Sequence, residues 1–136
     1  MRFWLVKQEP TSYTFARFVS DRTTWWTGVH HPTAQRNLKE MRARDRGIYY
    51  HTGSERAAVG TFQVVGLPRA DPDDDRGAWM VELRADRPLT VPVSMATVRS
   101  DPAFARSPLV REPRLSIVPL SRPEWERFLQ LGGDLR

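Results

Sequence analysis

The chain contains no cysteine and only three histidines, and these scarcities exclude several kinds of site. Without cysteine there are no disulfides, no zinc–thiolate sites and no thiol nucleophiles. Three imidazoles can in principle bind zinc, but adjacent residues such as His30 and His31 rarely point at one metal ion. We therefore expect neither a metal site nor a cofactor.

Long apolar runs are absent as well. The run at residues 3–6 is too short for a signal peptide, and no segment approaches the roughly 20 apolar residues that span a bilayer. We expect a cytoplasmic protein with no membrane partner. A chain of 136 residues, 40% of them hydrophobic, fits a single globular domain over residues 1–136.

Signatures of catalysis are missing too. The glycines are too scattered for a phosphate-binding loop, and no G-x-S-x-G motif presents a serine nucleophile. The acidic residues form no obvious catalytic pair along the sequence. We therefore predict a binding domain that catalyses nothing. One enzyme alternative stays open, in which His51 and Glu9 act as acid and base on a nucleic acid or a nucleotide.

What the chain does have is arginine. The net charge is +5, and all but two of the 21 basic residues are arginine. The planar guanidinium group suits phosphate groups and base edges. This composition favours nucleic acid as the partner, although a GC-rich genome also raises arginine usage.

Apolar patterning and turn residues predict the order of the secondary structure. Strands are expected over residues 2–7, 48–51, 57–65, 79–85 and 115–120. Helices are expected after Thr14, from Pro32, over Ser94–Arg99, and after a capping box at Ser121–Glu124. Residues 23–31 are expected to be irregular, and Pro88 and Pro92 to bracket a short extended piece. Strands outnumber helices without regular alternation, which predicts an α+β fold, a small curled β-barrel with peripheral helices.

One segment, residues 25–38, gathers aromatic and polar side chains at the start of a predicted helix. Trp25 and Trp26 precede a flexible glycine, and His30 and His31 follow it. A helix N-terminus presents unpaired N–H groups, and an aromatic wall offers a base stacking worth about 1–3 kcal/mol. Polar groups beside such a wall can read the edge of the base. In the alternative interpretation, the two tryptophans belong to the core and the histidines form a surface turn.

Five short motifs follow one another along the chain. They are Trp4–Pro10, Trp26–Val29 with Asn37, Leu38 and Met41, then Asp45–Arg46 with Tyr50–Gly53 and Val59–Gly60, then Pro92–Ser94, and last Arg114–Pro119. In this order they resemble the blocks of the EVE domain family, which belongs to the PUA-like folds. No single block is specific, but five in register cover nearly the whole chain.

This resemblance implies a PUA-like barrel whose pocket accepts a base, often a modified one, flipped out of DNA or RNA. YTH-type readers of methylated adenine share that layout, and the EVE family is associated with modified cytosine in DNA. Carried onto this sequence, the resemblance implies a pocket formed by Lys7, Glu9, Trp26, Gly28, Val29, His30, His31, Asn37, Tyr50, His51, Arg114 and Ser116. Within it, Lys7 meets phosphate, Glu9 accepts from an exocyclic amine, and Trp26 is a wall. Alternatively, Glu9 forms a structural ion pair with Lys7 or Arg114.

The sequence departs from the family pattern on the expected recognition face. His30 and His31 stand where the family commonly has Arg-Asn, Thr27 replaces an acid, and Gln8 replaces Ser or Thr. The base preference of relatives is therefore not transferred. We predict a nucleic-acid-binding module with its own preference, and His30 and His31 predict pH-dependent binding. A small-ligand or protein-interaction module is the remaining alternative.

Overall fold

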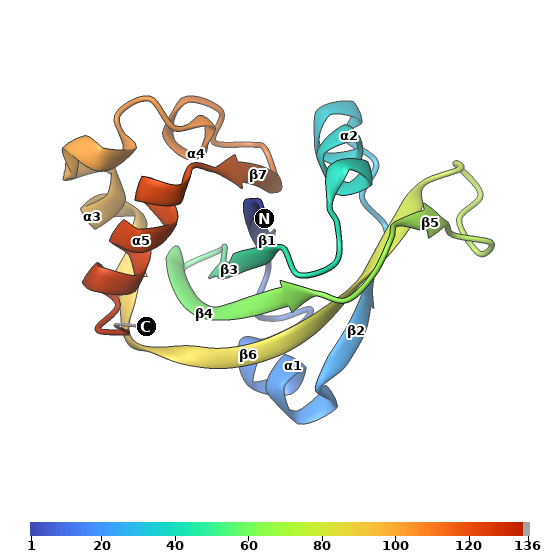
Figure 1. Ribbon diagram of the computed structural model, residues 1–136, viewed down its shortest axis with the longest axis horizontal. Helices are drawn as coiled ribbons and strands as arrows, with labels where there is room; N and C mark the ends of the chain where they lie inside the picture. The colour runs from blue at the N-terminus through green and yellow to red at the C-terminus, as the bar shows by residue number, and fades with distance from the viewer. Residues whose placement is uncertain (135–136) are drawn as a thin grey trace.

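A computed structural model describes residues 1–134 of the chain (Figure 1). Within these residues seven strands form one curled sheet, and five α-helices and a short 3-10 helix lie around it. The predicted α+β class is confirmed. The elements are β1 (Phe3–Gln8), α1 (Phe15–Asp21), β2 (Thr23–Trp26), α2 (Pro32–Glu40), β3 (Arg46–His51), β4 (Ala57–Val64), β5 (Arg69–Ala70), β6 (Trp79–Ser94), α3 (Met95–Ser100), η1 (Pro102–Phe104), α4 (Pro108–Arg111), β7 (Ile117–Leu120) and α5 (Arg122–Leu131).

Strand β1 lies inside the sheet and runs parallel to β3. The strand order is β2-β6-β4-β3-β1-β7, with β5 paired to β6, and the other pairings are antiparallel. Residues 3–6 are buried, so both faces of this strand are covered. Parallel strands end at the same edge of a sheet. Lys7 therefore lies opposite Tyr50, and Gln8 lies opposite His51.

Helix α2 covers the gap between the two edges of the curled sheet. Within residues 1–134 no ladder joins the edge strands β2 and β7, so the sheet is not closed, and closure into a barrel is not confirmed. Helix α2 packs against both β6 and β7 and buries Ala34 and Leu38. The Asn37 side-chain amide donates to the Ile117 carbonyl of β7 at 2.8 Å. This bond fixes the helix to the edge strand.

An aromatic cluster fills the space between α1 and the sheet. The Tyr49 ring lies 5.3 Å from Phe15, 5.5 Å from Phe18 and 5.7 Å from Trp26, measured between ring centroids. Gly60 of β4 makes room for it, because a Cβ atom there would lie 2.3 Å from the Phe15 ring. The cluster thereby joins α1, β2 and β3.

The carboxylate of Asp45 ties the start of β1 to the turn before β3. Asp45 is 3% exposed. It accepts hydrogen bonds from the Arg2 N–H at 2.9 Å, the Trp4 indole N–H at 3.0 Å and the Arg42 N–H at 3.0 Å. Bonds to an ionised acceptor are stronger than neutral ones. They hold the parallel register that brings the ends of β1 and β3 together.

The structure differs from the prediction in the segment expected to be irregular. Residues 23–26 form strand β2, which pairs antiparallel with β6. The short elements β5, η1 and α4 were also not predicted, because two to four residues carry too little periodicity to register.

Strand β6 is longer than predicted and passes through both prolines. The ladder with β4 pairs Gly60 with Pro88 and next pairs Ala58 with Val93, so most of residues 88–92 bulges away from β4. Proline has no N–H to donate and is tolerated at such irregularities. The extended piece expected between Pro88 and Pro92 is therefore part of β6, and the prolines lie where the ladder itself is interrupted.

No helix among residues 1–134 is both long enough and apolar enough to cross a bilayer.

Candidate nucleic-acid interface

The two tryptophans of β2 face opposite sides of the strand. Trp26 is 6% exposed and meets Tyr49 edge-on within the aromatic cluster. Trp25 is 36% exposed, and the guanidinium of Arg69 lies 4.4 Å from the centre of its ring. The alternative that both are core residues therefore holds for Trp26 only.

The segment from Gly28 to His31 is fastened to its surroundings. Gly28 adopts a φ of +72°, which permits the turn after β2. Val29 packs against the core, and its carbonyl accepts from the Gln35 side-chain amide at 2.7 Å. The His30 ring lies 2.8 Å from an Asp74 carboxylate oxygen. This hydrogen bond holds the pKa of Asp74 below its ordinary value.

His31 is the N-cap of helix α2. Its Nδ1 accepts from the N–H groups of Thr33 at 3.2 Å and Ala34 at 3.5 Å. These are two of the donors that a helix N-terminus leaves without an internal partner. The polar groups that the sequence places at this helix entry are therefore engaged in building it, and pH-dependent binding through His30 and His31 stays a prediction.

Both nitrogens of His51 are also engaged. Nε2 accepts from the Phe15 N–H at 3.0 Å, so it carries no proton. Nδ1 lies 2.9 Å from a carboxylate oxygen of Glu55 and is the nitrogen left to carry the proton. The ring is 7% exposed. His51 thus anchors the start of α1 to the hairpin between β3 and β4.

Lys7 and Tyr50, paired across β1 and β3, line a hollow beside the strand ends. The Lys7 ammonium lies 5.8 Å from the centre of the Tyr50 ring and donates to the Pro113 carbonyl at 2.9 Å. The cavity measures about 180 Å³. It is lined by Lys7, Tyr50, Thr52, Gly53, Arg56, Met95, Arg99, Leu109 and Pro113. We call it the strand-end hollow.

The strand-end hollow is electropositive. Burial, and then the nearby charge of Arg99, lower the pKa of Lys7. Burial raises the pKa of Tyr50, while the charges of Arg56 and Arg99 oppose that rise. Within residues 1–134 no carboxylate forms an ion pair with Lys7, Arg56 or Arg99. The site therefore favours an anionic or electron-rich ligand.

Three other predicted pocket residues, Glu9, Arg114 and Ser116, lie in the segments that follow β1 or precede β7. Glu9 is exposed, and its carbonyl accepts from the N–H groups of Ser12 and Tyr13 in the turn after β1. The Ser116 carbonyl accepts from the Lys7 N–H at 2.9 Å, and Arg114 is exposed next to Pro113. In the described part of the chain, Glu9 forms no ion pair with Lys7 or Arg114.

The structure thus brings Lys7 and Tyr50 together in the strand-end hollow, and Trp26 is not among its lining residues. Sequence reasoning missed Arg56 and Arg99, which look like any other exposed arginine along the chain. No local pattern in the sequence sets either arginine apart from the others.

The family model of the EVE domain matches residues 2–131. The chain belongs to the EVE domain family. Comparison with curated proteins found no significant match. No group of three or more histidine, aspartate or glutamate side chains is arranged to hold a metal ion in the part of the chain that the structure describes.

Solved structures share the fold over nearly the full length. Rpa0253 from Rhodopseudomonas palustris is 33% identical, with a TM-score of 0.92, and the match covers 98% of this chain and 94% of that one. Atu2648 from Agrobacterium tumefaciens is 28% identical, with a TM-score of 0.93 and the same coverage. Human THYN1, solved with DNA that contains 5-methylcytosine, is 21% identical, with a TM-score of 0.87 and full coverage of both chains.

Proposed function

We propose that this EVE domain is a non-catalytic nucleic-acid-binding module that takes one base, a modified one, into the strand-end hollow. The observation that carries the proposal is the lining of the hollow. Tyr50, Met95 and Leu109 supply aromatic and apolar surface. Lys7, Arg56 and Arg99 supply positive charges that have no carboxylate partner within the described residues.

The size of the hollow fits a small flat ligand. Sites for drug-sized molecules measure roughly 300–1,000 Å³. The strand-end hollow, at about 180 Å³, suits a single ring system better. Flipping a base out of a duplex costs a few kcal/mol of stacking, which interactions in the hollow and with the flanking phosphates must return.

The solved complex of human THYN1 with DNA that contains 5-methylcytosine supports the nucleic-acid part of the proposal, because this chain belongs to the same family fold. The basic composition supports it as well. A panel of plain and modified oligonucleotides decides between DNA and RNA and identifies the preferred base. The cytoplasmic location stays a prediction.

The bonds of His51 argue against the enzyme alternative. A catalytic acid or base needs a nitrogen within reach of the substrate, and both His51 nitrogens already have partners at about hydrogen-bond distance. Glu9, the other candidate, lies exposed in the turn after β1. Turnover of a nucleic acid or nucleotide that is abolished by His51→Ala or Glu9→Gln is the result that would restore this alternative.

A matched pair of lysine variants tests the proposed function. The chain has two lysines, and both lie over aromatic rings: Lys7 over Tyr50, and Lys39 over Trp79 at 5.2 Å. Lys7→Met keeps the apolar stem and removes the charge from the hollow, and Lys39→Met does the same on α2. Binding is measured by fluorescence anisotropy with single- and double-stranded oligonucleotides of DNA and RNA, plain and modified, at low salt.

We expect wild-type binding that weakens with salt, and binding about tenfold weaker in Lys7→Met, the value of one charge-assisted hydrogen bond. Lys39→Met is expected to bind as wild type does. Equal losses of affinity in both variants would show that binding depends on the overall surface charge and not on the strand-end hollow. No binding to any oligonucleotide, together with tight binding of a peptide or metabolite, would favour the interaction-module alternative.

A further inference from the structure

Two depressions meet at a pair of arginines beside the strand-end hollow. A neighbouring depression is lined by Glu55, Arg56, Ser94, Met95, Ala96 and Arg99. It shares Arg56, Met95 and Arg99 with the strand-end hollow. Arg56 and Arg99 therefore lie on the boundary that both spaces have in common, which we call the shared rim.

The backbone at Arg56 is in an unfavourable conformation for a side chain. Its φ is +47°, in the left-handed region that favours glycine. Arg22 and Arg44 also have a positive φ, so this conformation alone marks no site. At Arg56 it allows a test, because glycine at this position removes the side chain and relieves the backbone.

The charges on this rim have no carboxylate partner among residues 1–134. Lys7, Arg56 and Arg99 pair with no carboxylate of the described residues, and Arg99 lies close enough to Lys7 to disfavour its charged form. The one acid of the neighbouring depression, Glu55, is held by His51 at 2.9 Å. Three cations that repel one another are relieved by a bound anion.

We propose that Arg56 and Arg99, with Lys7 behind them, hold one phosphodiester group of the nucleic acid at the shared rim. The flipped base enters the strand-end hollow, and the adjoining nucleotide lies over the depression at Ser94 and Ala96. This assignment rests on the proposed function and adds to it the path of the backbone. Guanidinium groups suit the role because their planar forks bind phosphate oxygens in pairs.

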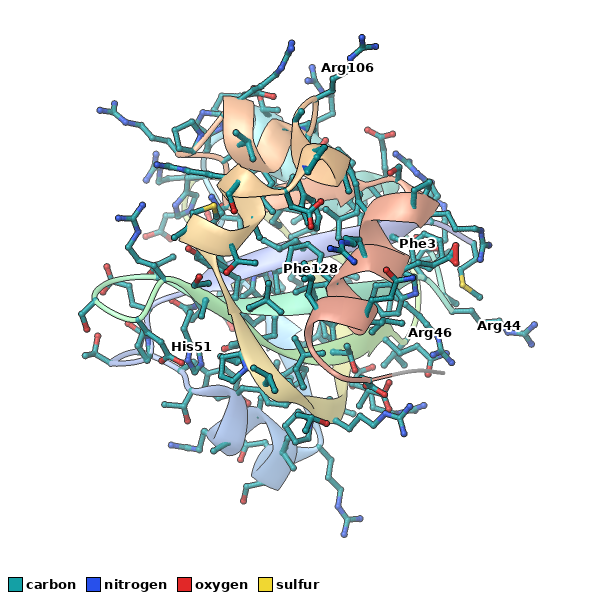
Figure 2. All side chains as sticks on the ribbon, turned by 90° about the vertical axis from the view of Figure 1, so that its left-hand side faces the viewer. Phe3, Arg44, Arg46, His51, Arg106 and Phe128 are labelled. Carbon is teal, nitrogen blue, oxygen red and sulfur yellow. The ribbon has the colours of Figure 1, made fainter. Side chains whose placement is uncertain are left out.

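The test combines arginine variants with oligonucleotides that carry one neutral methylphosphonate linkage, moved stepwise along the strand. Arg56→Gly removes the side chain and relieves the backbone, so its Tm is expected to equal or exceed that of wild type. Arg99→Gln removes the second charge from the exposed face of α3. Arg44→Gly is the matched control, because Arg44 also has a positive φ, of +76°. It lies across the molecule from His51, which directly follows Tyr50 of the strand-end hollow (Figure 2).

We expect Arg56→Gly and Arg99→Gln each to bind about tenfold more weakly, and the slope of log affinity against log salt to fall by about 0.7–0.9 for each phosphate that is no longer neutralised. Wild type is expected to bind one oligonucleotide of the methylphosphonate series more weakly than the others, the one whose neutral linkage falls at the shared rim. The Arg56→Gly, Arg99→Gln double variant is expected to bind all of the series equally. Arg44→Gly is expected to bind as wild type does. Two results would overturn the assignment and leave the proposed function standing. One is that Arg56→Gly binds as tightly as wild type. The other is that wild type loses the same affinity wherever the methylphosphonate is placed.

A second measurement separates this assignment from the proposed function. If wild type binds no oligonucleotide, the proposed function fails, and inorganic phosphate is then titrated and followed by ³¹P line broadening. Broadening that disappears in the Arg56→Gly, Arg99→Gln double variant supports an anion site for free phosphate. Broadening that is absent, or unchanged in the double variant, removes the site altogether.

Discussion

Two regions of the molecule carry similar side chains but use them differently. The helix entry, residues 26–37, and the strand-end hollow both combine aromatic rings with polar groups. In the helix entry, His31 caps α2 and Asn37 bonds to β7. In the strand-end hollow, Arg56 and Arg99 have no carboxylate partner among the described residues. The first region builds the fold, and the second is left with groups that a ligand can use.

Residue type is therefore a weaker guide to a binding site than the hydrogen bonds that its residues already make. A polar group that already has a good partner gains little from a ligand, because the exchange replaces one bond with another. A cation without a carboxylate partner gains more from a bound anion. Variants in both regions separate effects on stability from effects on binding, and the largest effect is expected in the helix entry.

Trp26→Ala is expected to lower the free energy of unfolding by about 3–5 kcal/mol, since it empties part of the aromatic cluster. Urea unfolding measures this decrease, with Trp25→Ala as the more exposed control. Loss of binding in Trp26→Ala is then a consequence of unfolding. A variant that stays as stable as wild type but no longer binds would make Trp26 a wall of the base pocket, as the family resemblance predicts.

Asn37→Ala is expected to cost about 1–3 kcal/mol, because it leaves the buried Ile117 carbonyl without the amide donor. The neighbouring Arg36→Ala, at an exposed position, serves as the control in the same unfolding experiment. Affinity for oligonucleotides is expected to be unchanged where Asn37→Ala is folded. A base-dependent change of affinity with unchanged stability would move Asn37 from the fold to the site.

A smaller effect is expected at Asp74. Because the hydrogen bond with His30 lowers the folded-state pKa of Asp74 below 3.8, its contribution to stability is present above that pH. It is lost as the pH falls through the lowered value. Asp74→Asn is therefore expected to be less stable than wild type near neutral pH, and the difference is expected to vanish in strong acid.

Unfolding followed between about pH 2 and 6 measures this difference, with Asp75→Asn removing the same charge without the bond to His30. A difference that persists unchanged at the acid end would show that the carboxylate does not act through its ionised form. The helix entry would then need another account of how His30 is held.

The sequence predicted the local structure well where capping residues mark the start of a helix. The Ser121–Glu124 capping box is present with both of its hydrogen bonds, and α1 begins after Thr14 as predicted. Ser94, which was expected to lie within α3, is instead its N-cap. These signals succeed because they depend on neighbours three or four residues away. Strand β2 was missed because its partner, β6, lies more than 50 residues further along the chain.

The strand-end hollow was predicted only in part, for the same reason. Lys7 and Tyr50 belong to motifs that the family resemblance singles out. Arg56 comes from the β3–β4 hairpin and Arg99 from α3, and only the tertiary structure brings them beside Lys7 and Tyr50. No local pattern distinguishes those two arginines from the exposed arginines elsewhere on the surface.

The two lysines allow a direct test of whether nucleic acid binds at the strand-end hollow. Reductive ¹³C-methylation labels Lys7 and Lys39 and keeps their charge, and NMR follows each during titration with an oligonucleotide. We predict that the Lys7 signal shifts on binding. The pKa of Lys7, which burial and then the charge of Arg99 lower in the free protein, is predicted to rise beside the phosphate. The Lys39 signal is predicted to stay in place. A shift of Lys39 with Lys7 unmoved would contradict the account.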